Sequence, residues 1–222
     1  MLHAIWCAVL LLSAPAKTTD VHQVVGRLEA RYNSATTLRA TFLERYNEAG
    51  RTTREEAGTV FFRRPGKMRW EYESPEPKLF VTDGRTVWFY VPGDKTVVRA
   101  PVKETSDWRL PFALLTRKAA LSRICSRIDL ETGAGAAESG HVMLRCTPKE
   151  RGEGIREILI GVDSETGDLE RVVVRETAGI EIDFRFANWA RDLPLAESAF
   201  RFSAPAGVAI VNGPVAQEDP DN

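Results

Sequence analysis

The chain has 222 residues, of which 43% are hydrophobic, and a formal net charge of −1 at pH 7. This length suits one domain with a substantial core, and we expect that domain over residues 17–212, followed by a polar tail over 213–222. Acidic and basic residues are interspersed, so no basic stripe is available to hold a phosphate backbone. The composition therefore argues against nucleic-acid binding.

The first sixteen residues have the features of an export signal. They contain no Asp, Glu, Lys or Arg, run apolar from Ala4 to Leu12, and end in Ala14-Pro15-Ala16, a small-x-small cleavage pattern. We therefore predict a signal peptide over residues 1–16, the alternative being a buried N-terminal strand or helix. Cys7 lies inside the apolar run, where it is badly placed for lipid modification, so we expect a soluble mature protein.

The mature chain is predicted to begin with a helix. Five apolar residues have the spacing of one helical face, namely Val21, Val24, Val25, Leu28 and Tyr32. Asp20 precedes them, and Gln23 is placed to complete a capping box with it. From Leu38 to Tyr46 the apolar period falls to two, which predicts the first strand.

Two-residue alternation continues along most of the remaining chain. It predicts further strands at residues 59–63, 67–73, 78–82, 86–91, 96–100, 124–130, 142–147, 155–162, 169–176 and 180–186. Asp83-Gly84 is a hairpin turn signal, and Trp108–Leu115 loses the strand period and fits a short helix opened by Pro111. About ten strands in one meander predict a single strongly curved antiparallel sheet, with short helices on its concave side.

The residues that usually perform catalysis or bind metals do not form recognisable motifs. His22 and His141 have no Cys or carboxylate at metal-ligand spacing, and neither a G-x-S-x-G elbow nor a phosphate-binding glycine loop is present. The Glu residues alternate with basic residues, which predicts charge pairs on outer strand faces. We therefore expect a protein that is not an enzyme and has neither a metal nor a cofactor.

Two cysteines remain after removal of the signal peptide, Cys125 and Cys146. An even pair in an exported protein favours a disulfide. A regular hairpin that places Ile128 and Leu144 on one face puts Cys125 on the opposite side, so the disulfide requires a bulge or another register. The alternative is two buried free thiols.

Large apolar side chains are abundant in the predicted sheet. They are Phe42, Phe61, Met68, Trp70, Phe80, Trp88, Phe89, Phe184 and Phe186. One interpretation is an ordinary core, and the other is a lined cavity, because a barrel-like sheet of more than about eight strands encloses more space than its own side chains fill.

Two sequence blocks favour the cavity. The segments Arg64-Pro65-Gly66-Lys67-Met68-Arg69-Trp70 and Val81–Pro92 resemble the R-P-x-x-Φ-x-W strand and V-S-D-G-K-T-L-W-x-Y hairpin of the LolA family. Leu110–Leu115 and Ala199–Val208 resemble the mid-chain helix and closing strand of that family. The resemblance implies an unclosed half β-barrel with a lid of short helices on the concave side, and a periplasmic location.

The resemblance also implies a task and a set of site residues. The task is to accept triacylated lipoproteins from an inner-membrane ABC transporter complex and pass them, as a monomer, to an outer-membrane receptor. Arg64 matches the family arginine that bonds to the lid and acts as its latch. The residues expected to line the acyl cavity are Phe42, Met68, Trp70, Trp88, Phe112, Leu114 and Leu115.

Two other functions remain open at this point. One is a periplasmic sensor or regulator that binds lipoproteins with the same fold, which would need a second interaction domain. The other is a lipid-modifying hydrolase, which would need a nucleophile and a base that the sequence does not reveal. The cysteine pair and the polar tail are departures from the family pattern.

Overall fold

The computed structural model describes residues 20–104, 112, 120–131, 141–149 and 154–213. The predicted signal peptide and nearly all of the predicted tail lie outside these ranges. The predicted helix at Trp108–Leu115 also lies outside them except for Phe112, so the expected cavity residues Leu114 and Leu115 are not among the described residues.

The predicted N-terminal helix is confirmed as α1 (Val21–Asn33). Asp20 is its N-cap, and the side chain of Asp20 accepts a hydrogen bond from the backbone N–H of His22 at 2.9 Å. Val24, Leu28 and Tyr32 form the buried stripe. They belong to the same hydrophobic cluster as the inward-facing strand residues, so α1 covers the inner face of the sheet.

Twelve strands form one open sheet in the described part of the chain. They are β1 (Thr37–Glu48), β2 (Arg51–Arg63), β3 (Lys67–Ser74), β4 (Lys78–Thr82), β5 (Thr86–Tyr90), β6 (Thr96–Pro101), β7 (Cys125–Leu130), β8 (His141–Pro148), β9 (Ile155–Asp163), β10 (Leu169–Glu176), β11 (Ile180–Arg191) and β12 (Ala209–Asn212). The predicted class, a mostly β fold with an unclosed antiparallel half-barrel, is confirmed. The one parallel pair among these strands joins β12 to β6.

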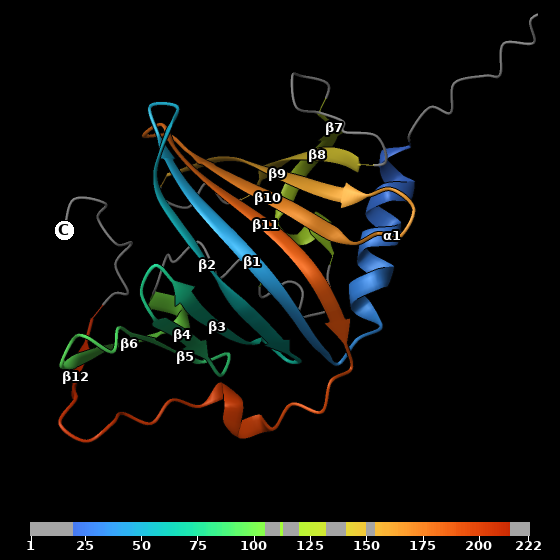
Figure 1. Cartoon of the computed structure of the whole chain (residues 1–222). Helices are drawn as coiled ribbons and strands as arrows, with labels where there is room; N and C mark the ends of the chain where they lie inside the picture. Colours follow the sequence, from blue (N-terminus) through green and yellow to red (C-terminus); the bar gives the residue numbers. More distant parts are fainter. Residues whose placement is uncertain (1–19, 105–111, 113–119, 132–140, 150–153, 214–222) are drawn as a thin grey trace, which may run out of the picture.

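The strand order corrects the prediction of one continuous meander. The order is β12-β6-β5-β4-β3-β2-β1-β11-β10-β9-β8-β7, so two meanders meet where β1 pairs with β11. That pairing runs from Leu38 opposite Arg191 to Glu48 opposite Ile180. Local alternation identifies hairpins, but it carries no information on a pairing between strands about 140 residues apart in sequence. The pairing of β1 with β11 joins the two meanders into the curved sheet seen in Figure 1.

The hairpin of β1 and β2 is longer than expected. The prediction began the second strand at Thr59, whereas β2 begins at Arg51 and pairs with β1 from there. Residues 51–56 are mostly polar, so they lack the apolar alternation that identifies a half-buried strand. Ala49 and Gly50 have φ values of 48° and 77°, the left-handed conformations that a tight two-residue hairpin turn needs.

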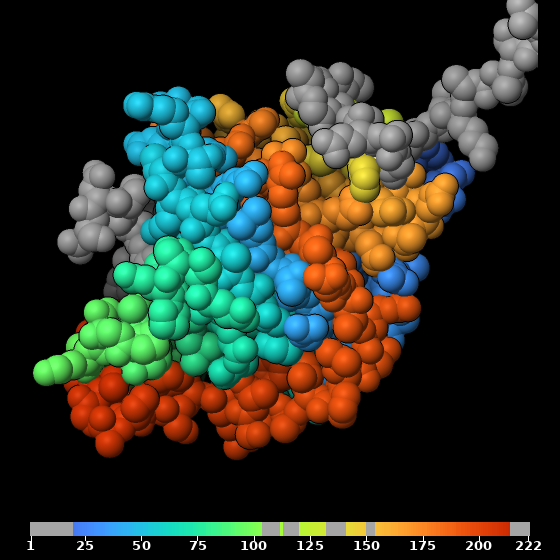
Figure 2. Space-filling view, in the orientation of Figure 1, coloured from blue at the N-terminus to red at the C-terminus, as the bar shows by residue number. Residues whose placement is uncertain are grey.

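The C-terminal segment covers part of the outer face. Arg69 donates to the backbone carbonyl of Ala199 at 3.1 Å, and Phe200, in a 3-10 turn at Glu197–Phe200, is only 1% exposed. Figures 1 and 2 show this segment, in red, along one edge of the molecule before it reaches β12. The expected closing strand at Ala199–Val208 is therefore wrong, and the strand follows it as β12.

The structure joins Cys125 and Cys146 by a disulfide bond of 2.05 Å. The register of β7 against β8 shifts between Cys125 and Arg127, so a bulge places Ser126 out of the regular pairing. This bulge removes the geometric conflict that a regular hairpin would create. Both cysteines are buried, and the bond connects β7, at the edge of the described sheet, to its neighbouring strand β8.

We expect the double substitution Cys125→Ala/Cys146→Ala to lower the free energy of unfolding by about 3 kcal/mol, because the unfolded chain loses a closed loop. Urea denaturation measures the change, and reduced wild-type protein is the control that should shift by a similar amount. Two thiols that react freely with an alkylating agent in unfolded, unreduced protein would contradict the bond.

Candidate functional site

Aromatic rings gather at the centre of the inner face. Trp70 of β3 is fully buried and makes edge-on contacts with Phe42 at 4.9 Å and Phe184 at 5.8 Å between ring centroids. Phe42 comes from β1 and Phe184 from β11, and Phe186 follows on the same strand. Edge-on aromatic pairs at these distances are attractive beyond the area they bury.

The structure brings together four of the residues expected to line the cavity. Phe42 faces inward on β1, and Met68 and Trp70 occupy successive inward positions on β3. All three are at most 3% exposed. Phe112 is the fourth, and it belongs to the stretch between β6 and β7 rather than to the sheet. The inner face therefore holds a continuous apolar surface.

Phe112 lies in the middle of this surface. Its ring centroid is 5.4 Å from that of Trp70, 5.3 Å from that of Phe184 and 5.4 Å from that of Phe186, and the residue is 5% exposed. Removing a buried phenylalanine of this kind typically costs about 3–5 kcal/mol. Phe112, which belongs to none of the twelve strands, thus places its ring at the centre of the aromatic surface on the inner face.

Trp88 is not part of the inner surface. Phe80, Phe89 and Val98 are aligned across β4, β5 and β6 on the inner side, so Trp88 points to the outer side. There it stacks on Phe202 with centroids 5.5 Å apart. Alternation along a strand separates its two faces but does not indicate which face is concave. The predicted placement of Trp88 in the acyl cavity is therefore wrong.

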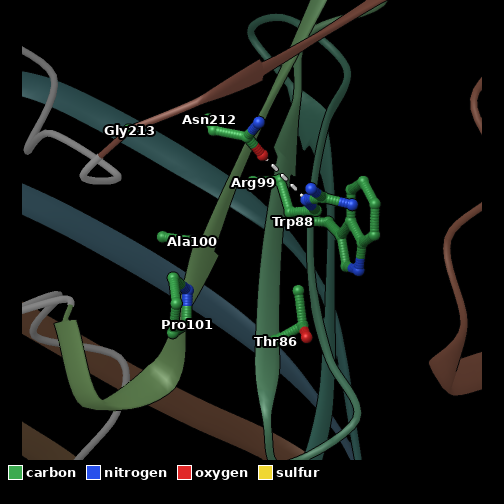
Figure 3. Close-up of a pocket in the computed structure, with 7 residues that line it drawn as sticks. All are labelled: Thr86, Trp88, Arg99, Ala100, Pro101, Asn212 and Gly213. Carbon is green, nitrogen blue, oxygen red and sulfur yellow. Dashed lines mark hydrogen bonds between the residues drawn. The ribbon is translucent and has the colours of Figure 1, made fainter.

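A pocket of about 800 Å³ adjoins Trp88 on this outer side. Figure 3 shows the residues that line it, which lie on β5, β6 and β12 or directly follow β12, with the guanidinium of Arg99 against the indole of Trp88. The guanidinium carbon lies 5.4 Å from the ring centroid, and Arg99 Nε donates to Asn212 Oδ1 at 2.9 Å. The pocket is therefore lined by polar and charged groups as well as by the indole.

Arg64 connects the end of β2 to the end of α1. Its Nη2 donates to the backbone carbonyl of Tyr32 at 2.5 Å, and its backbone N–H donates to the carbonyl of Thr36 at 3.0 Å. Carbonyls in the last turn of a helix have no partner within the helix, so they are good acceptors for a guanidinium. Arg64 Nε is buried and has no hydrogen-bond partner among the described residues.

The same end of α1 is fastened to β10. The Tyr32 hydroxyl accepts a hydrogen bond from the backbone N–H of Leu169 at 2.8 Å, and Trp189 Nε1 donates to the carbonyl of Leu169 at 2.6 Å. Burial raises the pKa of the Tyr32 hydroxyl, so it remains neutral at physiological pH. Arg31 forms an ion pair with Asp168 at 2.5 Å. Sequence reasoning identified none of these contacts, because each joins residues far apart in the chain.

Charged residues also occur on the inner face. Glu44 and Glu56 lie opposite each other on β1 and β2, and each is only 2% exposed. The expectation that the Glu residues would all lie on outer faces is wrong for these two. Glu44 lies two residues from both Phe42 and Tyr46, so it shares their face of β1. This spacing is the feature of the sequence that indicates an inward position for Glu44.

No helix in the described part of the chain is both long enough and apolar enough to cross a membrane.

Comparison with known proteins agrees with this geometry. The family profile described as "Outer membrane lipoprotein carrier protein LolA" matches residues 33–203. The outer-membrane lipoprotein carrier protein of Methylococcus capsulatus is 32% identical over 185 residues, covering 83% of this chain and 85% of the relative. That of Dechloromonas aromatica is 31% identical over 214 residues and covers 95% of each chain.

A solved structure shares the fold. The crystal structure of an uncharacterized conserved protein from Thermus thermophilus matches with a TM-score of 0.55 and 18% sequence identity, covering 86% of this chain and 98% of that one. The family profile spans far more than half of the sequence, including the arginine-proline motif and the aromatic residues of β1, β3 and β11. The chain therefore belongs to the LolA family of outer-membrane lipoprotein carrier proteins.

Proposed function

We propose that this protein carries lipoproteins through the periplasm by holding their acyl chains against the inner face of its sheet. The observation that carries the proposal is the position of Phe112. Its ring completes the aromatic surface formed by Trp70, Phe184 and Phe186, but it comes from outside the sheet. Withdrawal of Phe112 would expose that surface to a ligand without breaking a strand pairing.

The energy of acyl transfer is large enough to drive such an opening. Each methylene removed from water contributes about 0.8 kcal/mol, so three long acyl chains offer on the order of 30 kcal/mol. A carrier that retained all of this energy would not release its cargo. Part of it is offset by displacing Phe112 and by loosening the contacts of α1 with the sheet.

Arg64 is proposed as the latch of the closed state. Its bond to the Tyr32 carbonyl ties the sheet to the last turn of α1. A charge-assisted hydrogen bond contributes roughly 1.5–3 kcal/mol, which is enough to shift an equilibrium between open and closed forms tenfold or more. Closure would return Phe112 to the aromatic surface and expel the acyl chains.

The names of the relatives support a direction of transport. Proteins from Methylococcus capsulatus and Dechloromonas aromatica are called outer-membrane lipoprotein carrier proteins. We propose that this chain accepts triacylated lipoproteins from an inner-membrane ABC transporter complex and delivers them to an acceptor at the outer membrane. The acyl chains are bound and released, and no covalent bond changes.

A two-stage transfer assay tests this function. Lipoprotein labelled in its acyl chains is released from inner-membrane vesicles to the purified protein, and the loaded protein is then mixed with outer-membrane vesicles. We expect a soluble complex of one lipoprotein with one carrier, visible by native mass spectrometry, and subsequent transfer of the label. Stable uptake without onward transfer would instead favour a sensor of lipoproteins, and absence of uptake would contradict both functions.

A further inference from the structure

Five polar side chains form a cluster on the inner face, next to the aromatic surface. The inner polar cluster consists of Glu44, Arg54, Glu56, Tyr72 and Lys78. Lys78 Nζ lies 2.7 Å from Glu56 Oε1, and Arg54 Nε lies 3.7 Å from Glu56 Oε2. The Tyr72 hydroxyl donates to Glu44 Oε2 at 2.9 Å.

The strand registers fix this cluster on the concave side. Glu44 is two residues beyond Phe42 on β1 and lies opposite Glu56 on β2. Tyr72 is two residues beyond Trp70 on β3 and lies opposite Lys78 on β4. Side chains two residues apart on a strand point to the same face, so the cluster continues the surface on which the aromatic rings lie.

Folding alone does not explain charges in this position. The carboxylates of Glu44 and Glu56 are only 2% exposed, and taking a charge out of water costs several kcal/mol. Buried ion pairs replaced by apolar residues of similar volume are often as stable or more stable. On the neighbouring strand β11 the same inner face is filled by Ile182 and Phe184, which shows that apolar residues pack at this level of the sheet.

The cluster begins where the aromatic surface ends. The ring of Tyr72 contacts that of Phe42 at 5.0 Å, and the ring of Phe42 contacts Trp70 at 4.9 Å. An acyl chain lying along Trp70 and Phe42 would therefore bring the polar group at its end to the hydroxyl of Tyr72 and the ammonium of Lys78. The ammonium and the guanidinium carry three and five N–H donors, and carbonyl oxygens are suitable acceptors for them.

We propose that the inner polar cluster is the subsite for the ester carbonyls of the lipid anchor, an inference that rests on the proposed function. Lys78 and Arg54 supply the N–H donors to these oxygens, and the Tyr72 hydroxyl, which donates its one proton to Glu44, fixes that carboxylate beside them. Glu44 and Glu56 hold the donors in place on an otherwise apolar face. The subsite thereby sets the depth at which the acyl chains lie, because the ester groups stop at the polar cluster while the methylenes cover the aromatic rings.

The test uses two synthetic lipopeptides with the same peptide and the same chain length. One carries two palmitoyl chains on glycerol through ester bonds, and the other carries two hexadecyl chains through ether bonds, which lack the carbonyl oxygens. We expect the wild-type protein to bind the ester about tenfold more tightly, which corresponds to about 1.4 kcal/mol. The double variant Glu56→Gln/Lys78→Met should bind both probes with the weaker affinity.

A matched control comes from the outer face of the same sheet. Arg171 and Asp183 form a part-buried bidentate pair there, at 2.8 and 2.9 Å, and the double variant Arg171→Met/Asp183→Asn should keep the tenfold preference. Arg54→Met, which removes one donor group and keeps an unbranched side chain, gives a second variant with a reduced preference if the double variant does not fold. Equal binding of both probes by wild-type protein would overturn the subsite but leave the carrier function standing, whereas binding of neither would overturn the carrier function itself.

Discussion

Replacing Arg64 with leucine should leave lipoprotein uptake intact and reduce onward transfer to outer-membrane vesicles at least tenfold. The substitution removes the bond from the guanidinium to the carbonyl of Tyr32 at the end of α1. Loss of a charge-assisted hydrogen bond worth roughly 1.5–3 kcal/mol shifts the equilibrium toward the open form tenfold or more. The added isobutyl group also offers apolar contact to the acyl chains, so both effects favour retention of the cargo.

The neighbouring arginine provides a matched control. Arg63 also donates to a backbone carbonyl, that of Leu195 in the C-terminal segment on the outer face. Arg63→Leu therefore removes the same chemical group one residue earlier, at the end of β2, without removing a contact to α1, and we expect normal release. Onward transfer by Arg64→Leu at the wild-type rate would exclude Arg64 from the release step.

Replacing Phe112 with alanine should change stability and affinity in opposite directions. The apo protein loses a ring that is packed 5.3–5.4 Å from three other rings, so its free energy of unfolding should fall by about 3–5 kcal/mol. An acyl ligand no longer has to displace that ring, so its affinity should rise at least tenfold. Urea denaturation measures the first effect, and titration with a fluorescent fatty-acyl probe measures the second.

Phe200→Ala separates this effect from a general loss of packing. Phe200 is 1% exposed, but it belongs to the segment on the outer face. Its truncation should lower stability by a similar amount and leave acyl affinity unchanged. If Phe112→Ala weakens acyl binding, then Phe112 acts as part of the binding surface and does not compete with the ligand.

Much of the fold could be predicted because it depends on local patterns. The stripe of Val24, Leu28 and Tyr32 identified α1, and alternation around Met68 and Trp70 identified β3 together with its buried face. These patterns depend on residues only a few positions apart, and a single sequence displays them directly.

The features that were missed depend on distant residues. The pairing of β1 with β11 and the contact of Arg64 with Tyr32 join segments whose proximity no local period encodes.

The face of the sheet on which a residue lies was also wrong in two places. Trp88 was misplaced because the strand pattern is symmetrical between the two faces of the sheet. The inward position of Glu44 was not predicted, because charged residues on strands usually face solvent. The only indication of its inward position is its spacing of two residues from Phe42.

The most direct test of acyl binding on the inner face uses a lipoprotein that carries a photoreactive diazirine in one acyl chain. After uptake and irradiation, mass spectrometry identifies the residues that are crosslinked. We expect crosslinks on inward positions of β1, β3 and β11, including Phe42, Trp70 and Phe184. Crosslinks concentrated at Trp88 and Phe202, on the outer side, would contradict a carrier that holds acyl chains within the curve of its sheet.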